Sequence, residues 1–179
     1  MAKTIAPLFS LEASGQLAKT LVYDRRGYVR NYVIPTNPKT DDQANIRHPF
    51  AGTAAVVKVI HQNVENEIRG VAEDAGKPGY RWTSFLVGEV LRGNGWNVYD
   101  AAFNALTSAE QDNWQNDAQA IGIAPTTLNY GTAPSKFAGR AMFIVASAMY
   151  NRLGLGLAAP TGSNSGDWAN YIAGTSSSP

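Results

Sequence analysis

The sequence predicts a mainly α fold with some α+β character: a helical domain, an N-terminal β-hairpin arm and an extended C-terminal tail. Three observations lead to this prediction. Apolar residues recur at helical spacing through the middle of the chain, two runs of β-branched and aromatic residues flank a turn near residue 27, and small polar residues dominate after residue 156. We therefore expect an arm over residues 1–39, a helical domain over 40–156 and a flexible tail over 157–179.

The predicted hairpin spans Leu17–Ile34. Its strands are Leu17–Tyr23 and Tyr28–Ile34, and the polar stretch between them ends in Gly27, which can adopt the positive φ that such loops need. Neither face of the second strand is purely apolar, and an isolated two-stranded hairpin is only marginally stable in water. We therefore expect the hairpin to pack on its own helices or on another subunit.

Capping boxes and apolar stripes predict the helices. Thr40–Gln43 is a capping box that begins the first helix, which Pro49 is expected to kink or break. Thr107–Glu110 is a second capping box, which opens a helix that runs to residue 121. Further helices are expected over 57–71, 82–91, 97–106 and 135–153. The last has the widest apolar arc, and so it should be central and buried.

Composition limits the possible functions. Charged residues make up 16% of the 179 residues and the net charge is +1, so the whole chain has no strong field for nucleic acid or an anionic membrane. A surface with few charges suits a protein covered by neighbours, although an ordinary polar surface has the same composition. Five cations against one anion between Lys19 and Lys39 form a local basic patch, which could meet phosphates, an acidic neighbour or solvent.

The chain has no cysteine, which excludes disulfides and thiolate chemistry. Its longest apolar run, Ala141–Tyr150, is about half as long as a membrane span requires. The first residues lack the apolar stretch of a secretion signal. We expect a soluble protein that is made in the cytoplasm and has no membrane partner.

Few residues are arranged for catalysis. His48 and His61 are the only histidines, and a helical pair of His61 and Glu65 offers two of the three or four ligands that zinc needs. The sequence has no G-x-S-x-G motif and no phosphate-binding loop. We predict no catalytic residue, no metal and no cofactor. The enzyme hypothesis that stays open is a hydrolase that uses His61 and a carboxylate.

Aromatic and basic side chains are instead candidates for partner contacts. Tyr28, Arg30 and Tyr32 share one face of the predicted strand, a pattern that can stack bases or pack on a neighbouring protein. The predicted partner-binding residues are Tyr23, Arg25, Arg26, Tyr28, Arg30 and Tyr32 of the hairpin, with Trp168 and Tyr171 of the tail.

One stretch of the chain carries a longer motif. After the turn Asp24–Gly27, residues Val29–Arg47 form the string V-R-x-x-V-x-P-x-N-P-x-T-x-x-Q-x-x-x-R, and Leu106-Thr107 with Gln111 and Trp114 come later. These features resemble a family of small tailed-phage virion proteins, in which the two motifs are usually closer together. The resemblance covers about the first 50 residues and about a dozen around Trp114.

The resemblance implies a non-enzymatic virion structural protein that self-assembles or decorates the head or neck. The partners would then be other copies of the chain or a capsid, portal or neck protein, and the location would be the virion after synthesis in the host cytoplasm. No catalytic residues come with this resemblance. The alternative is a nucleic-acid-binding module in which the basic hairpin grips the phosphate backbone.

Overall fold

The computed structural model describes residues 2–3, 15–17, 21–23, 28–31, 41–123, 135–156 and 158–175. The chain divides into two compact units: an N-terminal unit, Met1–Pro38, and a helical domain, Lys39–Pro179. Within the described residues helix predominates, which confirms the prediction of a mainly α fold.

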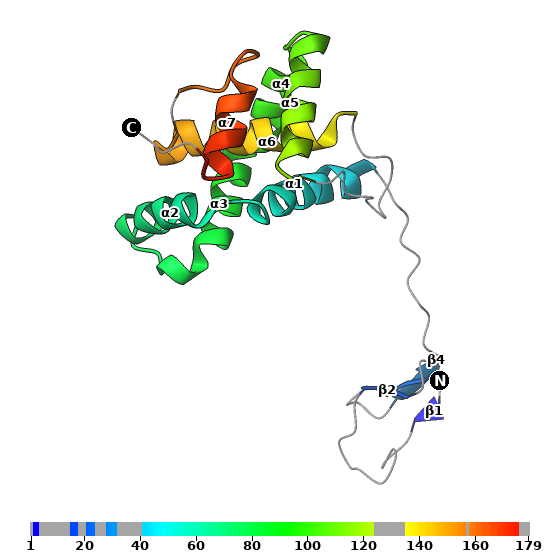
Figure 1. Ribbon diagram of the computed structural model, residues 1–179. Helices are drawn as coiled ribbons and strands as arrows, with labels where there is room; N and C mark the ends of the chain where they lie inside the picture. The colour runs from blue at the N-terminus through cyan, green and yellow to red at the C-terminus, as the bar shows by residue number, and fades with distance from the viewer. Residues whose placement is uncertain are drawn as a thin grey trace. The chain divides into compact units, whose positions relative to one another are not determined.

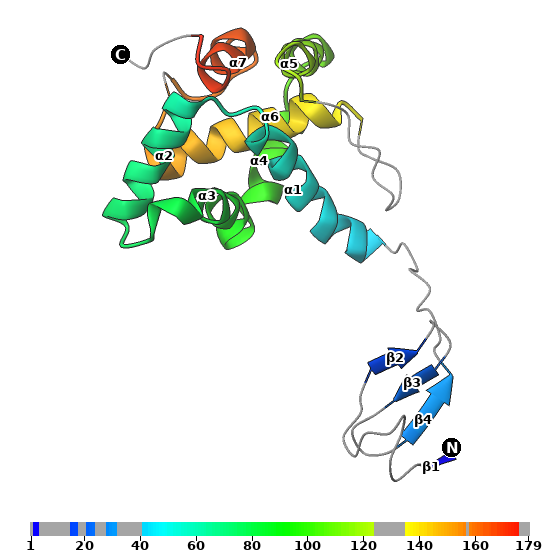
Figure 2. The same cartoon turned by 60° about the horizontal axis from the view of Figure 1, so that its bottom comes forward.

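The N-terminal unit contains a small antiparallel sheet with the strand order β1-β4-β3-β2 (Figure 2). In this sheet β3 and β4 pair with Val22 opposite Arg30, and β2 pairs with β3. The single strand predicted over residues 17–23 is therefore two short strands, because the chain reverses direction between Leu17 and Leu21. The strands are β1 (Ala2–Lys3), β2 (Gly15–Leu17), β3 (Leu21–Tyr23) and β4 (Tyr28–Asn31).

The helical domain is built from seven α-helices and shorter helical turns within its described part (Figure 1). The α-helices are α1 (Asp41–Val57), α2 (Gln62–Asp74), α3 (Trp82–Leu91), α4 (Gly95–Asn104), α5 (Ser108–Ala120), α6 (Phe137–Ala148) and α7 (Ser165–Ile172). The turns are η2 (Gly79–Arg81) and η3 (Arg92–Asn94), with the π-helical η4 (Met149–Leu153) after α6.

Helix α6 forms the middle of the domain. Helices α5 and α7 lie side by side on one side of it and α1 and α3 lie on the other (Figures 1 and 2). Every residue of α6 is buried, and the surrounding helices α1, α3, α4, α5 and α7 all contact it. This confirms the prediction that the apolar helix in the region 135–153 is central.

Helices α5 and α6 meet closely at a glycine. The Gly139 N–H donates to the side-chain Oε1 of Gln115 at 2.8 Å, and a Cβ at Gly139 would collide with the backbone of Trp114 and Gln115. The Trp114 ring lies edge-on to Phe143 at 5.0 Å, and its Nε1 donates to the carbonyl of Thr161 at 2.8 Å. A side chain at position 139 would therefore separate the two helices.

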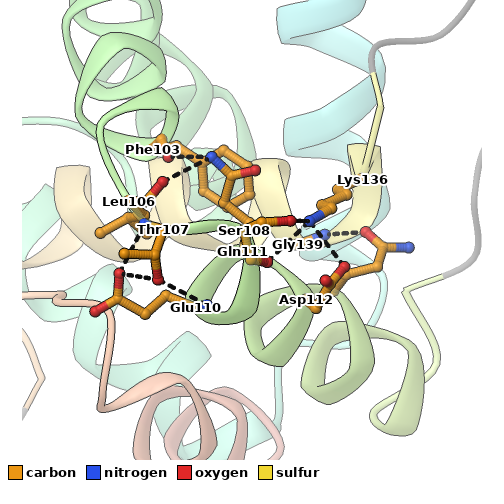
Figure 3. Close-up of polar contacts among 10 residues, drawn as sticks. Phe103, Leu106, Thr107, Ser108, Glu110, Gln111, Asp112, Lys136 and Gly139 are labelled. Carbon is orange, nitrogen blue, oxygen red and sulfur yellow. Dashed lines mark hydrogen bonds and ion pairs between the residues drawn. The ribbon is translucent and has the colours of Figure 1, made fainter.

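A network of polar contacts fixes the start of α5 (Figure 3). The predicted capping box is confirmed: Thr107 accepts from the Glu110 N–H, while the Glu110 carboxylate accepts from the Thr107 N–H at 2.8 Å. Gln111 Nε2 donates to the carbonyls of Phe103 and Leu106, which end α4. Lys136 then joins α5 to the start of α6 through Ser108 and Asp112.

Helix α1 continues through Pro49, so of the two predicted effects, a kink or a break, the break is wrong. Pro49 is buried, and its carbonyl accepts a hydrogen bond from the Thr53 hydroxyl at 2.8 Å. A proline inside a helix costs about 3 kcal/mol. The packing of α1 against α6 offsets this cost, and that packing cannot be read from local sequence.

The prediction of an extended tail from residue 157 is wrong for residues 165–172, which form α7 and pack on α5 and α6. Trp168, Tyr171 and Ile172 are buried. These residues are three and four positions apart, so they form one apolar stripe on a helix. A composition rich in Gly, Ser and Asn hides this short amphipathic segment.

Candidate functional site

Three of the six predicted contact residues of the N-terminal unit lie in strands of the sheet. Tyr23 lies in β3, while Tyr28 and Arg30 lie in β4, where the backbone register pairs Tyr28 with Lys3. Arg25, Arg26 and Tyr32 lie outside the described residues. The contact role of all six residues stays a prediction.

The two predicted contact residues of the tail pack inside their own domain. Trp168 is 2% exposed and Tyr171 is 1% exposed, and their rings meet edge-on at 5.6 Å. Trp168 Nε1 donates to the Ala158 carbonyl at 3.1 Å, and the Tyr171 hydroxyl donates to the Glu67 carboxylate. Burial in the core of this chain accounts for these two aromatic residues.

The histidines have structural surroundings. His61 is the N-cap of α2, where its Nδ1 accepts from the Asn63 N–H at 3.2 Å, and the neighbouring Glu65 accepts from Arg69 Nε at 2.9 Å. His48 lies edge-on to Phe137. In the described ranges, no group of three or more His, Asp or Glu is placed to hold a metal.

The same ranges contain no helix with the length and apolarity needed to cross a bilayer.

A buried arginine forms the most enclosed charged cluster. Arg140 of α6 is 8% exposed; its Nη1 contacts Asp100, and its Nη2 donates to Asn104 Oδ1 at 2.8 Å, so that it joins α6 to α4. Its guanidinium also lies 5.0 Å from the ring of Phe103. The cluster is packed and shares no residue with the cavity described next, so it serves to hold two helices together.

The best candidate for a binding site is a groove along the outer side of α3. Its volume is about 310 Å³, and it includes three cations, one carboxylate and an apolar floor. We call it the α3 groove. Its lining residues are Lys77, Pro78, Arg81, Ser84, Phe85, Gly88, Glu89 and Arg92.

The turn between α2 and α3 holds Lys77 at one end of this groove. Gly76 has a φ of 72°, which ends α2, and the N–H of Lys77 then donates to the Ala72 carbonyl at 2.8 Å. The N–H of Arg81 donates to the Pro78 carbonyl at 2.9 Å and starts the next helical segment. Hydrogen bonds therefore fix the backbone at Lys77 and Arg81, the first two cations of the groove.

The electrostatics of the α3 groove favour an anion. Lys77, Arg81 and Arg92 are exposed, whereas the Glu89 side chain is only 12% exposed and lies 3.4 Å from Arg92. The Arg92 side chain is 73% exposed, so its pairing with Glu89 leaves it free to meet a ligand. Next to the groove the Arg81 guanidinium lies 5.5 Å from the ring of Tyr80, which is 71% exposed.

Sequence reasoning missed this groove. Its cations are too far apart in sequence to form a run. The signal that could have found part of it is helical spacing: Ser84 and Gly88 lie four positions apart on one face of α3, with Arg81 directly before the helix and Arg92 directly after it.

The motif around Trp114 has a structural explanation. Thr107 caps α5, the Gln111 side-chain amide donates to carbonyls at and just after the end of α4, and Trp114 fills the core. No protein-family model matches the chain, and no curated protein or solved structure is significantly similar to it.

Proposed function

We propose that this chain is a non-enzymatic structural subunit of a tailed-phage virion. In this proposal the N-terminal unit attaches it to other copies or to a head or neck protein. The observation that carries the proposal is the small size of that unit, which has 38 residues and strands of only two to four residues.

A unit of this size needs support from outside its own core. Chains below about 40 residues usually need a disulfide, a metal or an oligomeric partner to stay folded. The sequence has no cysteine, and both histidines belong to the helical domain. A disulfide and a thiolate metal site are therefore excluded for the N-terminal unit. The support that remains is a protein surface, either that of its own helical domain or that of a second molecule, and the proposal takes the second molecule.

Charge and sheet topology support attachment to another molecule. The N-terminal unit has five Lys and Arg against two Asp and Glu, a net charge of +3, whereas the helical domain has ten against twelve, a net charge of −2. The unit therefore suits an acidic partner surface. The edges of its sheet are β1 and β2, and an edge strand offers unpaired backbone groups to an added strand.

The resemblance to tailed-phage virion proteins adds the location. The string from Val29 to Arg47 begins in β4 and ends in α1, so it spans the junction between the two units. A motif at such a junction fits an arm that positions the body of a subunit in a particle.

The test measures self-association and incorporation into particles. Light scattering after size-exclusion chromatography of the full chain should show oligomers that grow with concentration. Replacing both Arg25 and Arg26 by Ala should weaken that association by about tenfold, if each cation contributes about threefold at an exposed ion pair. The control is Lys58→Glu, which changes the net charge equally at an exposed residue of the helical domain.

Mass spectrometry of purified virions supplies the second readout. A monomeric chain that is present in virions in fixed proportion to the capsid protein supports decoration of a pre-formed shell. A chain that is monomeric at every concentration and absent from virions contradicts the proposal.

The positive charge of the N-terminal unit also favours one alternative, binding to nucleic acid. Fluorescence anisotropy with labelled DNA would then show binding that weakens steeply between about 50 and about 200 mM salt, because the protein displaces counterions. Arg25→Ala with Arg26→Ala should abolish the binding. A chain that leaves the anisotropy unchanged at the lower salt concentration removes this alternative.

A further inference from the structure

We infer that the α3 groove is a docking site for an acidic peptide segment of a partner protein. This inference rests on the proposed function, which it deepens by naming a second attachment surface and the chemistry of its partner. It depends on the shape of the groove, on its charge and on a glycine that nothing inside the domain explains.

The groove is the right size for a short segment. Its volume of about 310 Å³ is at the lower end of the range of about 300–1,000 Å³ for ligand pockets. Phe85 and Pro78 provide apolar contact, while Ser84 and the exposed cations surround it. This combination accommodates an apolar side chain with a carboxylate beside it.

The unexplained glycine is Gly88, which lies within α3 and is exposed. Glycine within a helix is less stable than alanine because it loses more backbone entropy on folding. A Cβ at Gly88 would meet nothing within 4 Å, so the interior of the domain does not require glycine there. A partner backbone that lies against Gly88, one of the residues that line the groove, would account for a glycine there.

The positions of the cations around Gly88 indicate which side chains the partner segment carries. Arg92, which directly follows α3, is another lining residue of the groove, and Ser84 lies four residues before Gly88 on the same face of α3. Arg81 lies one further turn away. A segment on Gly88 would therefore have its carboxylates within reach of a guanidinium at each end and a hydroxyl donor between them.

A protein segment fits this site better than a nucleic acid. Glu89 belongs to the groove, and Glu73 and Asp74 end α2 shortly before Lys77. The helical domain as a whole has a net charge of −2. A polyanion such as DNA would be repelled by this field, whereas a peptide with one or two carboxylates gains the local cations without that repulsion.

The test is a selection of random displayed peptides on the immobilised full chain, followed by anisotropy titrations with a selected peptide. We expect enrichment of peptides that combine Asp or Glu with an apolar residue. Arg81→Ala with Arg92→Ala should weaken binding by about tenfold, as expected for two exposed ion pairs of about threefold each. Lys58→Glu changes the net charge by the same amount and should leave the affinity unchanged.

Gly88→Ala and Gly70→Ala form the second comparison. Gly70 is an exposed glycine within α2 whose Cβ would also meet nothing within 4 Å. Both substitutions should raise the melting temperature. Only Gly88→Ala should lower the affinity for the peptide, by about tenfold if its methyl group displaces the segment. A merely structural glycine would not separate stability from binding in this way.

Three results would overturn the inference. The first is selected peptides without acidic enrichment, or with equal affinity for the Gly88→Ala chain. The second is full competition by a thymidine oligonucleotide, which would assign the groove to nucleic acid. The third is loss of self-association in the Arg81, Arg92 variant, which would assign it to a second copy. The first two failures leave self-association through Arg25 and Arg26 unaffected. In the third case the Arg25→Ala, Arg26→Ala chain still tests the proposed function separately.

Discussion

Replacing Gly139 by alanine should destabilise the domain even though alanine is the better helix former. The added Cβ would stand 2.4 Å from the Gln115 backbone nitrogen and 2.7 Å from Gln115 Cα, whereas ordinary contact begins at 3.4 Å. The atoms that it meets are backbone atoms of α5, and they cannot rotate away. Helices α5 and α6 would have to separate by about 1.0 Å, the difference between the shortest of these distances and ordinary contact.

The size of the effect follows from three contributions. Overpacking of this kind costs about 1–3 kcal/mol. Separation also weakens the hydrogen bond from Gly139 to Gln115, a bond that contributes about 1 kcal/mol. The helix propensity of alanine offsets about 1 kcal/mol of this loss. The free energy of unfolding should therefore fall by about 2 kcal/mol, and the melting temperature by about 4–8 °C for a chain of this size.

Urea and thermal unfolding, followed by far-UV circular dichroism, measure both quantities. Gly70→Ala is the matched control, because it changes the same residue type within an exposed helix. Gly139→Ala should lower the free energy of unfolding and the melting temperature, whereas this control should raise both. A Gly139→Ala chain that is as stable as the wild type, or more stable, would refute the close approach of α5 and α6.

Three further predictions concern exposed glycines, a helix cap and an alkaline titration. Gly88→Ala and Gly70→Ala should each raise the free energy of unfolding by about 0.5–1 kcal/mol in urea titrations, and a decrease would contradict the open space beside them. Thr107→Ala should lower it by about 1 kcal/mol, while Thr107→Ser should retain most of the stability. Burial, and then the hydrogen bond to Glu67, raise the pKa of Tyr171 above its usual value. The stabilisation that comes from this raised pKa is complete below the unfolded-state pKa of about 10 and is lost as the pH rises through the folded-state pKa. The free energy of unfolding should therefore fall above about pH 10, and it should fall less in the Tyr171→Phe chain. Equal slopes in the two chains would contradict this assignment.

Local signals predicted the elements whose stability is local. The capping box at Thr107 and the broad apolar arc of α6 can be read from a few neighbouring residues, and the structure contains both. Pro49 and α7 could not be predicted in this way. The helix through Pro49 is held by packing on α6, and the polar composition around Trp168 hides a stripe of only three apolar residues.

The α3 groove illustrates the same limit for a functional site. Lys77 follows α2, Arg81 ends η2 and Arg92 follows α3, so the groove draws its charge from three elements. Their approach depends on the turn at Gly76 and not on any one motif. A search for helix faces with a glycine between cations would have identified part of it.

The burial of α6 has a consequence for the way in which the protein is made. α1 lies against α6, and the first residue of α6 follows the last residue of α1 by eighty positions. On the ribosome, the earlier helices emerge before the helix that they surround has been synthesised. The nascent chain must therefore keep their apolar faces from aggregating until translation has passed residue 148, and the core then closes in a late step.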